Sequence, residues 1–257
     1  MKFRSVFIMA LNVALMYGCK EEKPNISKWS EAEQIMLKKE GHEEFFYWQL
    51  EDDKSLWEPI SYELQQLKEY EDTLKLILGD EKWNQTVQKE ATQELDSRLI
   101  LQEDNGDKIN ALMVHTGTVG EVRKMNMIEA HILNYQMSRF PMFTTPTEFH
   151  AFIATNRQLD KVRIYFGSSN TRWPPKAGIL LNELEKELSN GWKLKGHLHN
   201  HYSESEGNYV GILAPSLADA QYYKFLQQDF DMQLAFITNG FHSVTIDSSD
   251  FDKFESH

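Results

Sequence analysis

Three histidines alternate with other residues in the stretch Gly196-His197-Leu198-His199-Asn200-His201. Residues 192–195 precede it and alternate between apolar and basic side chains, a period that is typical of a β-strand. Residues two apart on a strand point to the same face, so the imidazoles of His199 and His201 are expected side by side. Imidazole is the commonest metal-ligating side chain near neutral pH, and the stretch therefore predicts part of a metal site.

A carboxylate follows in the segment Pro215-Ser216-Leu217-Ala218-Asp219. A Ser followed three residues later by an acid is a common helix start, and a carboxylate is electrostatically favoured at that end of a helix. The segment can therefore begin a helix and still present Asp219 to a metal. Two histidines and one carboxylate, with a fourth position left for water, are the ligand set of a catalytic zinc site. We expect His199, His201 and Asp219 to bind Zn2+.

The combined pattern Gly-x-x-His-x-His and Pro-Ser-x-x-Asp resembles the motif of the JAMM (MPN-plus) zinc metalloproteases, in particular their RadC-like, JAB-type bacterial branch. The chain departs from the family pattern at Tyr202, where the family usually has Pro. It also departs in residues 202–215, a longer interval before Ser216 than the family usually has. The resemblance implies a JAMM/MPN-like mixed sheet flanked by helices, and zinc-dependent hydrolysis of a peptide or isopeptide amide bond in a peptide or protein substrate.

The resemblance also implies roles for residues that do not bind the metal. In the family an upstream Glu near the start of an early strand acts as the general base, and Glu148 matches it because it opens the apolar segment 149–154. Glu121 is a second candidate, but it lies at the start of a predicted helix. Ser216 would hydrogen-bond the oxyanion that develops during amide hydrolysis. The family assigns no ligand role to His197, which we expect to be buried behind the ligands.

Two other interpretations stay open. A non-catalytic MPN-like binding module would keep the fold without the chemistry. A cupin-type metal-binding protein is the second, because the first cupin motif, Gly-x5-His-x-His-x4-Glu-x6-Gly, is matched by Gly191, His197, His199, Glu204 and Gly211. The second cupin motif is not found in the sequence, and the predicted helices on both sides of the histidine strand disfavour a jelly roll.

The N-terminus predicts export and lipidation. A basic start precedes an apolar run over residues 6–17, which is too short to span a bilayer and is typical of a signal peptide. Residues 15–19 resemble a bacterial lipoprotein box, so the predicted signal peptide is 1–18 and the predicted lipid-bearing residue is Cys19. An ordinary secretory leader is the alternative. The predicted location is the bacterial cell envelope, lipid-anchored at the outer membrane and either periplasmic or surface-exposed.

The composition limits the partners. The chain has 257 residues, of which 41% are hydrophobic and 26% charged, as in an ordinary globular protein. The formal net charge of −12 repels phosphate backbones, so a nucleic-acid partner is disfavoured.

The rest of the chain divides into a charged tether (residues 19–26), a helical module (27–97) and a domain of interleaved strands and helices (98–257). The resemblance implies that this last domain is a JAMM-like metallohydrolase domain. In the helical module the predicted helices run from the Ser30/Glu33 capping box toward Leu50, over 56–78 and over 83–95. In the domain, strands are predicted at 98–102 and 109–115 as a hairpin, at 149–154, 162–166, 233–238 and 242–246, and at the histidine stretch. Helices are predicted at 121–137, 179–188 and 217–228. This interleaving indicates an α/β (α+β) fold.

Overall fold

The computed structural model describes residues 29, 32–88, 106–205 and 208–255. Its strands are β1 (Glu33–Glu40), β2 (Glu43–Glu51), β3 (Glu121–Lys124), β4 (Phe149–Asn156), β5 (Lys161–Ser168), β6 (Lys193–Asn200), β7 (Tyr202–Ser205), β8 (Asn208–Val210), β9 (Leu234–Thr238) and β10 (His242–Asp247). Its α-helices are α2 (Gln65–Trp83), α5 (Gly106–His115), α6 (Met127–Arg139), α7 (Gly178–Leu188) and α8 (Leu217–Phe230). Short helical turns are η1 (Lys54–Trp57), η2 (Asn84–Gln88) and η3 (Ser248–Lys253).

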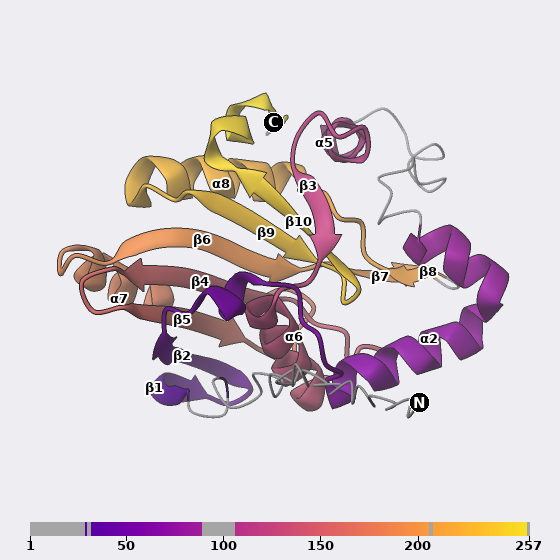
Figure 1. Cartoon of the computed structure of the whole chain (residues 1–257), viewed down its shortest axis with the longest axis horizontal. Helices are drawn as coiled ribbons and strands as arrows, with labels where there is room; N and C mark the ends of the chain where they lie inside the picture. The colour runs from indigo at the N-terminus through magenta and orange to yellow at the C-terminus, as the bar shows by residue number, and fades with distance from the viewer. Residues whose placement is uncertain (1–28, 30–31, 89–105, 206–207, 256–257) are drawn as a thin grey trace, which may run out of the picture.

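Eight strands form one sheet in the order β1-β2-β5-β4-β6-β9-β10-β3 (Figure 1). Neighbouring strands are antiparallel except β6 and β9, which are parallel. The connection between these two strands includes α8, as a parallel pair requires a long crossover. Strands β7 and β8 form a separate two-stranded sheet. The mixed sheet with its flanking helices confirms the predicted α/β (α+β) fold.

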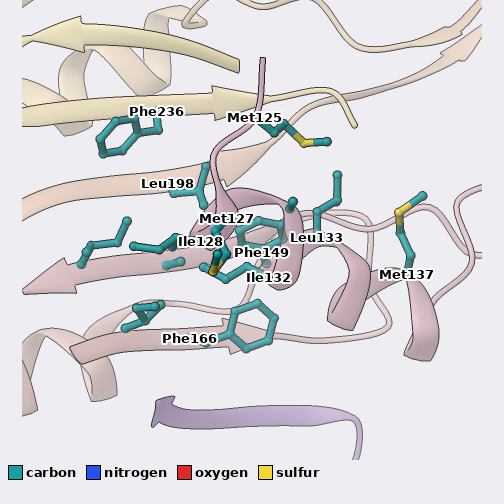
Figure 2. Packing of buried hydrophobic residues seen from close by; sticks show 14 of the residues in the cluster. Met125, Met127, Ile128, Ile132, Leu133, Met137, Phe149, Phe166, Leu198 and Phe236 are labelled. Carbon is teal, nitrogen blue, oxygen red and sulfur yellow. The ribbon is translucent and has the colours of Figure 1, made fainter. Parts of the chain in front are cut away.

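Helices cover both faces of the sheet. The central strands therefore carry apolar side chains on both of their faces, at successive positions and not only at every second one. On one face Phe152 and Ala154 of β4 share a buried cluster with α7 and α8. On the other face Phe149, Ala151 and Ile153 share a second cluster with α6 and α2. Figure 2 shows the α6 side chains packed against β4 and β5 in this second cluster. The histidine strand β6 is a central member of the sheet between these two layers.

The predicted helix from Ser30 toward Leu50 is wrong. Residues 33–51 form the β1–β2 hairpin, which turns at Gly41, and β2 pairs with β5 in the main sheet. The side chains of Phe46, Trp48 and Leu50 lie on one face of β2 at a period of two, and this burial outweighs the helix propensity of the surrounding Glu and Lys residues. The described residues 32–88 therefore do not form the separate helical module that was predicted over 27–97. Ser30 of the predicted capping box lies outside the described residues.

The predicted helix over 56–78 is confirmed as a helix, α2, but both of its ends differ from the prediction. The sequence predicts a helix over 56–78 that stops at Gly79, whereas α2 begins at Gln65 and continues to Trp83 with a kink at Gly79, where φ is 72°. The next helix, predicted over 83–95, is described only to Gln88, in the π-helical turn η2. Its remainder lies outside the described residues.

The hairpin predicted around residues 104–107 is also wrong. Residues 106–115 form α5, whose buried side chains at 110, 111, 114 and 115 follow a helical period. A short apolar run fits either period, and here packing against α8 selects the helix. Residues 98–102, the other half of the predicted hairpin, lie outside the described residues.

The helix predicted over 121–137 begins later than expected. Residues 121–124 form β3 at the edge of the sheet, paired with β10. Helix α6 starts only after Asn126, whose side chain caps it and forms a capping box with Glu129. The other elements predicted after residue 148 are confirmed within a few residues. None of the described helices is both long and apolar enough to cross a membrane. Residues 1–18, the tether over 19–26 and Cys19 lie outside the described part of the chain.

Candidate metal centre

The two predicted histidine ligands lie at the C-terminal end of the central strand β6. His199 is the penultimate residue of β6, and His201 follows the strand with its backbone N–H donated to the Thr238 carbonyl of β9. Gly196 permits this close pairing, because a Cβ at that position would lie 2.6 Å from the Phe236 ring and 2.8 Å from the Leu234 carbonyl oxygen. The glycine that begins the histidine motif is thus required for the approach of β9 to β6.

Three side chains converge at this end of β6. The Nε2 atoms of His199 and His201 are 3.0 Å apart. Asp219 places Oδ1 at 3.5 Å from His199 Nε2 and Oδ2 at 3.4 Å from His201 Nε2. One ligand atom from each residue lies within 4.8 Å of the other two, so this group can hold a metal ion. The structure brings together all three ligands that the sequence predicts.

The protonation of the histidines favours a cation at this point. His201 Nδ1 is 2.9 Å from the Ile212 carbonyl oxygen, which can only accept, so Nδ1 carries a proton and the lone pair of the neutral ring is on Nε2. Two imidazole nitrogens 3.0 Å apart cannot both present lone pairs to each other without a proton or a cation between them. The donor set therefore fits a metal ion.

The charges of the group are strongly coupled. Burial disfavours a charged imidazole, but the hydrogen bond and the charge of Asp219 outweigh it and raise the pKa of His201 to about 9. Burial by itself would raise the pKa of the Asp219 carboxyl, yet the charges and hydrogen bonds of His199 and His201 lower it well below its usual range. Asp219 is therefore a carboxylate at neutral pH, as a metal ligand must be.

Helix α8 fixes Asp219 through its first turn. Ser216 is the N-cap, and its Oγ accepts a hydrogen bond from the Asp219 N–H at 3.2 Å and donates one to Asp219 Oδ2 at 2.7 Å. The Ser216 N–H also donates to Oδ2, at 2.9 Å. This is the capping box that the sequence predicts. The hydroxyl proton of Ser216 points to Asp219, so the visible role of Ser216 is to orient this carboxylate.

Glu148 lies where the sequence places it, directly before β4. Its backbone N–H donates to the Arg172 carbonyl at 3.1 Å. Burial raises the pKa of Glu148, while the charges of His201 and His199 act in the opposite direction and that of Asp219 adds to the increase. The carboxyl is therefore within electrostatic reach of all three ligands.

Asn200 links Glu148 to the histidine strand, and the sequence analysis did not find it. The Asn200 side chain accepts from the Phe149 N–H at 3.1 Å and donates to the Thr147 carbonyl at 3.0 Å. It thus clamps the residues on both sides of Glu148. The sequence did hold a signal for a buried role of Asn200. It stands between the two histidines, so its side chain points to the face of β6 opposite the metal group.

His197 is buried behind the ligands, as expected, and is not part of the group. Its Nε2 is 3.0 Å from Nδ1 of His150, a second residue that the sequence analysis did not find. The ring of His197 packs against the rings of Phe152 and His199, with centroids at 5.0 and 5.4 Å. Burial lowers the pKa of His150 to about 3 and that of His197 well below its usual value, so both rings are neutral.

The remaining sequence candidates do not join the site. Glu121 is in β3, with β10 and β9 between it and β6. The cupin interpretation is contradicted by the eight-stranded mixed sheet with helical layers on its faces, since a jelly roll consists of two packed antiparallel sheets. Comparisons with protein families, with curated proteins and with solved structures return no match for this chain.

Proposed function

We propose that this protein is a zinc-dependent hydrolase that cleaves a peptide or isopeptide amide bond by JAMM-type chemistry. The observation that carries the proposal is the convergence of His199 Nε2, His201 Nε2 and the Asp219 carboxylate, with Glu148 within electrostatic reach. A site built only for structure would close its coordination with a fourth protein ligand. In the described residues the group has three members and so leaves a position for a reactant.

Zinc is the metal that this donor set favours. Two neutral imidazoles and one carboxylate suit Zn2+, whereas Mg2+ and Ca2+ prefer oxygen ligands alone. When bound, zinc supplies Lewis acidity, which polarises a carbonyl group and makes a water molecule acidic enough to react near pH 7.

The chain's own residues would supply the proton transfers. Glu148 accepts a proton from the attacking water and passes it to the leaving amine, and its raised pKa suits both steps. Asn200 holds the backbone on both sides of Glu148 in place. Ser216 orients Asp219 by donating its hydroxyl proton to Oδ2. The role that the family resemblance gives it, donation to the oxyanion, would require this proton to turn from Asp219 to the oxyanion.

We further infer an exported protein that is anchored by lipid at Cys19 and acts on a peptide or protein of the bacterial envelope. The support is the N-terminal sequence pattern together with the net charge of −12, which disfavours nucleic acid. Radiolabelled palmitate should enter the wild-type protein in its host and not the Cys19→Ser variant.

A variant of Glu148 tests the proposed enzyme. Glu148→Gln keeps the shape of the side chain but removes the basic carboxylate, so zinc content and fold should be unchanged while amide hydrolysis falls by about 100- to 10,000-fold. The assay follows new termini by mass spectrometry after incubation with envelope peptides and an isopeptide library. Glu121→Gln is the matched control and should stay active. Equal activity of Glu148→Gln and wild type would refute the role of Glu148, and a zinc-loaded protein without any cleavage would favour a binding module.

A further inference from the structure

A second candidate site lies at the other end of β4 and β6 from the metal centre. A cavity of about 430 Å3 is lined by the last residues of β4, the first residues of β6 and the turn η1. Lys193 begins β6 and His199 is six residues further along the strand, which corresponds to about 20 Å at 3.3 Å per residue. The cavity is therefore separate from the metal group and falls in the size range of small-ligand pockets.

The cavity gathers positive charge in an acidic protein. Lys193, Lys195 and Arg157 line it, while the whole chain has a net charge of −12. Within the described residues, these three side chains make no hydrogen bond or ion pair, although Lys195 lies within electrostatic reach of Asp247. Asp52 is the one acid in the lining, and its Oδ1 already accepts a hydrogen bond from the indole N–H of Trp57 at 3.2 Å. The three cations are thus available to an acidic ligand.

A fixed aromatic ring forms another wall. Trp57 is held by its bond to Asp52 and by its neighbour Leu56, which is buried in the core. The Nζ atom of Lys195 lies 6.0 Å from the centroid of the Trp57 ring, so one ligand can contact both the ring and the cation. Ring faces of this kind stack on flat or apolar faces of a ligand.

Neutral polar side chains complete the lining. Asn156 is buried, and its Oδ1 accepts from the backbone N–H groups of Gln158 and Leu159 at 3.0 and 3.2 Å. Among the residues that the structure describes, its amide nitrogen has no hydrogen-bond partner, so this group can donate to a ligand. Thr155 and Gln158 also line the cavity. An aromatic wall, amide and hydroxyl groups and clustered cations together match a ligand that has a sugar ring and an acidic group.

We propose that this cavity binds an acidic sugar, either a sugar phosphate or a uronic acid, independently of the metal centre. The sugar ring lies against Trp57, its hydroxyl groups bond to Asn156 and Thr155, and its acidic group is held by Lys193, Lys195 and Arg157. Arginine and lysine together can bind either a phosphate or a carboxylate.

Isothermal titration of the purified full-length chain with glucose 1-phosphate and with glucuronate tests the site. Saturable binding of at least one of the two is expected, and Lys195→Gln, Lys193→Gln and Trp57→Leu should each weaken it at least about tenfold. Lys193 is exposed, so its variant retains the fold, which near-ultraviolet circular dichroism verifies for all three variants. Lys186→Gln and Trp173→Leu are the matched controls and should bind as wild type does. The His199→Ala variant should also bind normally.

Further ligands separate the parts of the proposal. Glucose without an acidic group and inorganic phosphate without a ring should each bind at least about tenfold more weakly than glucose 1-phosphate. Phosphate that binds as tightly as glucose 1-phosphate would show a plain anion site and overturn the sugar assignment. Equal binding of glucose would overturn the role of the cations. No binding of either acidic sugar, or no effect of the three variants, would overturn the site itself. Loss of binding in His199→Ala would overturn its independence from the metal centre.

Discussion

Asn200 shows how one residue connects the two halves of the candidate active site. It stands between His199 and His201 in the sequence, yet its side chain is fully buried and bonds to the backbone beside Glu148. The histidines are placed to hold a metal ion on one side of the strand, and Asn200 fixes the proposed base from the other. The relative position of base and metal thus depends on a residue that contacts neither.

The variant Asn200→Ala should therefore separate metal binding from catalysis. Zinc binding is expected to stay within about threefold of wild type, because the ligands are untouched, while the hydrolysis rate falls by about 100-fold as Glu148 loses its fixed position. Stability should fall by about 1 to 3 kcal/mol, because the Phe149 N–H and the Thr147 carbonyl lose their partners. Asn200→Asp keeps the acceptor for Phe149 and should retain more activity. Unchanged hydrolysis in Asn200→Ala would contradict the positioning role.

The pH dependence of zinc affinity follows from His201. A protonated imidazole cannot bind a metal, and Asp219 raises the pKa of His201 to about 9 after burial is overcome. Below pH 9 zinc must displace this proton, so its apparent affinity should rise by up to about tenfold per pH unit from pH 7 to 9 and then level off. Competition with a chelator of known affinity measures the slope. An affinity that is independent of pH over this range would show that His201 is neutral in the metal-free protein.

At the scale of the elements, the segment from β8 to α8 presses closely on His201. A Cβ added to Gly211 would lie 2.4 Å from the carbonyl carbon of His201 and 2.5 Å from its oxygen, which are backbone atoms that cannot move aside. The next residue, Ile212, supplies the carbonyl oxygen that accepts a hydrogen bond from His201 Nδ1. Gly211 and Ile212, which lie in the long interval between His201 and Ser216, therefore orient His201.

Gly211→Ala should consequently disturb the metal site without touching a ligand. Overpacking of this kind costs about 1 to 3 kcal/mol, and displacement of His201 should weaken zinc binding by about tenfold or more. Gly178→Ala in α7 is the control, because a Cβ there meets nothing within 4 Å. Equal zinc affinity of the two variants would mean that the segment does not position His201.

The candidate site was more predictable than the elements around it. The alternation of His199 and His201 and the Ser216/Asp219 capping box are local patterns, and the structure shows both as expected. The hairpin of β1 and β2 was missed because its Glu and Lys residues suit a helix, and only the period-two burial of Phe46 and Trp48 reveals the strand. The bonds of Asn200 were not predictable, because their partners lie about fifty residues away and depend on strand order.

At the scale of the molecule, the N-terminal strands belong to the same sheet as the metal site. Strand β2 pairs with β5, and Phe46 and Trp48 share a buried cluster with α6, β4 and β5. Helix α2 adds Tyr70 and Leu74 to this cluster. The described residues 32–88 therefore contribute to the core and are not an attachment to it.

A fragment over residues 98–257 should consequently fail to fold. Removal of β1, β2 and α2 uncovers apolar side chains of β5 and α6 and leaves β5 as an unprotected edge strand, which is prone to aggregate. The fragment is expected to show no cooperative thermal transition and weak near-ultraviolet circular dichroism. The chain over residues 26–257 is the control and should unfold cooperatively. A folded, zinc-binding fragment would restore the interpretation of residues 27–97 as a separate module.

The most direct test of the whole account is the zinc content of the chain over residues 26–257, determined by metal analysis after dialysis against a weak chelator. The wild type should retain one zinc ion per chain. Replacement of His199, His201 or Asp219 by Ala should weaken binding by more than the roughly 10- to 100-fold that loss of a ligand's hydrogen-bond partner costs. His197→Ala should retain most of the metal, because its ring nitrogens face His150 and the core. Zinc that is lost in His197→Ala but kept in Asp219→Ala, or a wild type that binds none, would contradict the account.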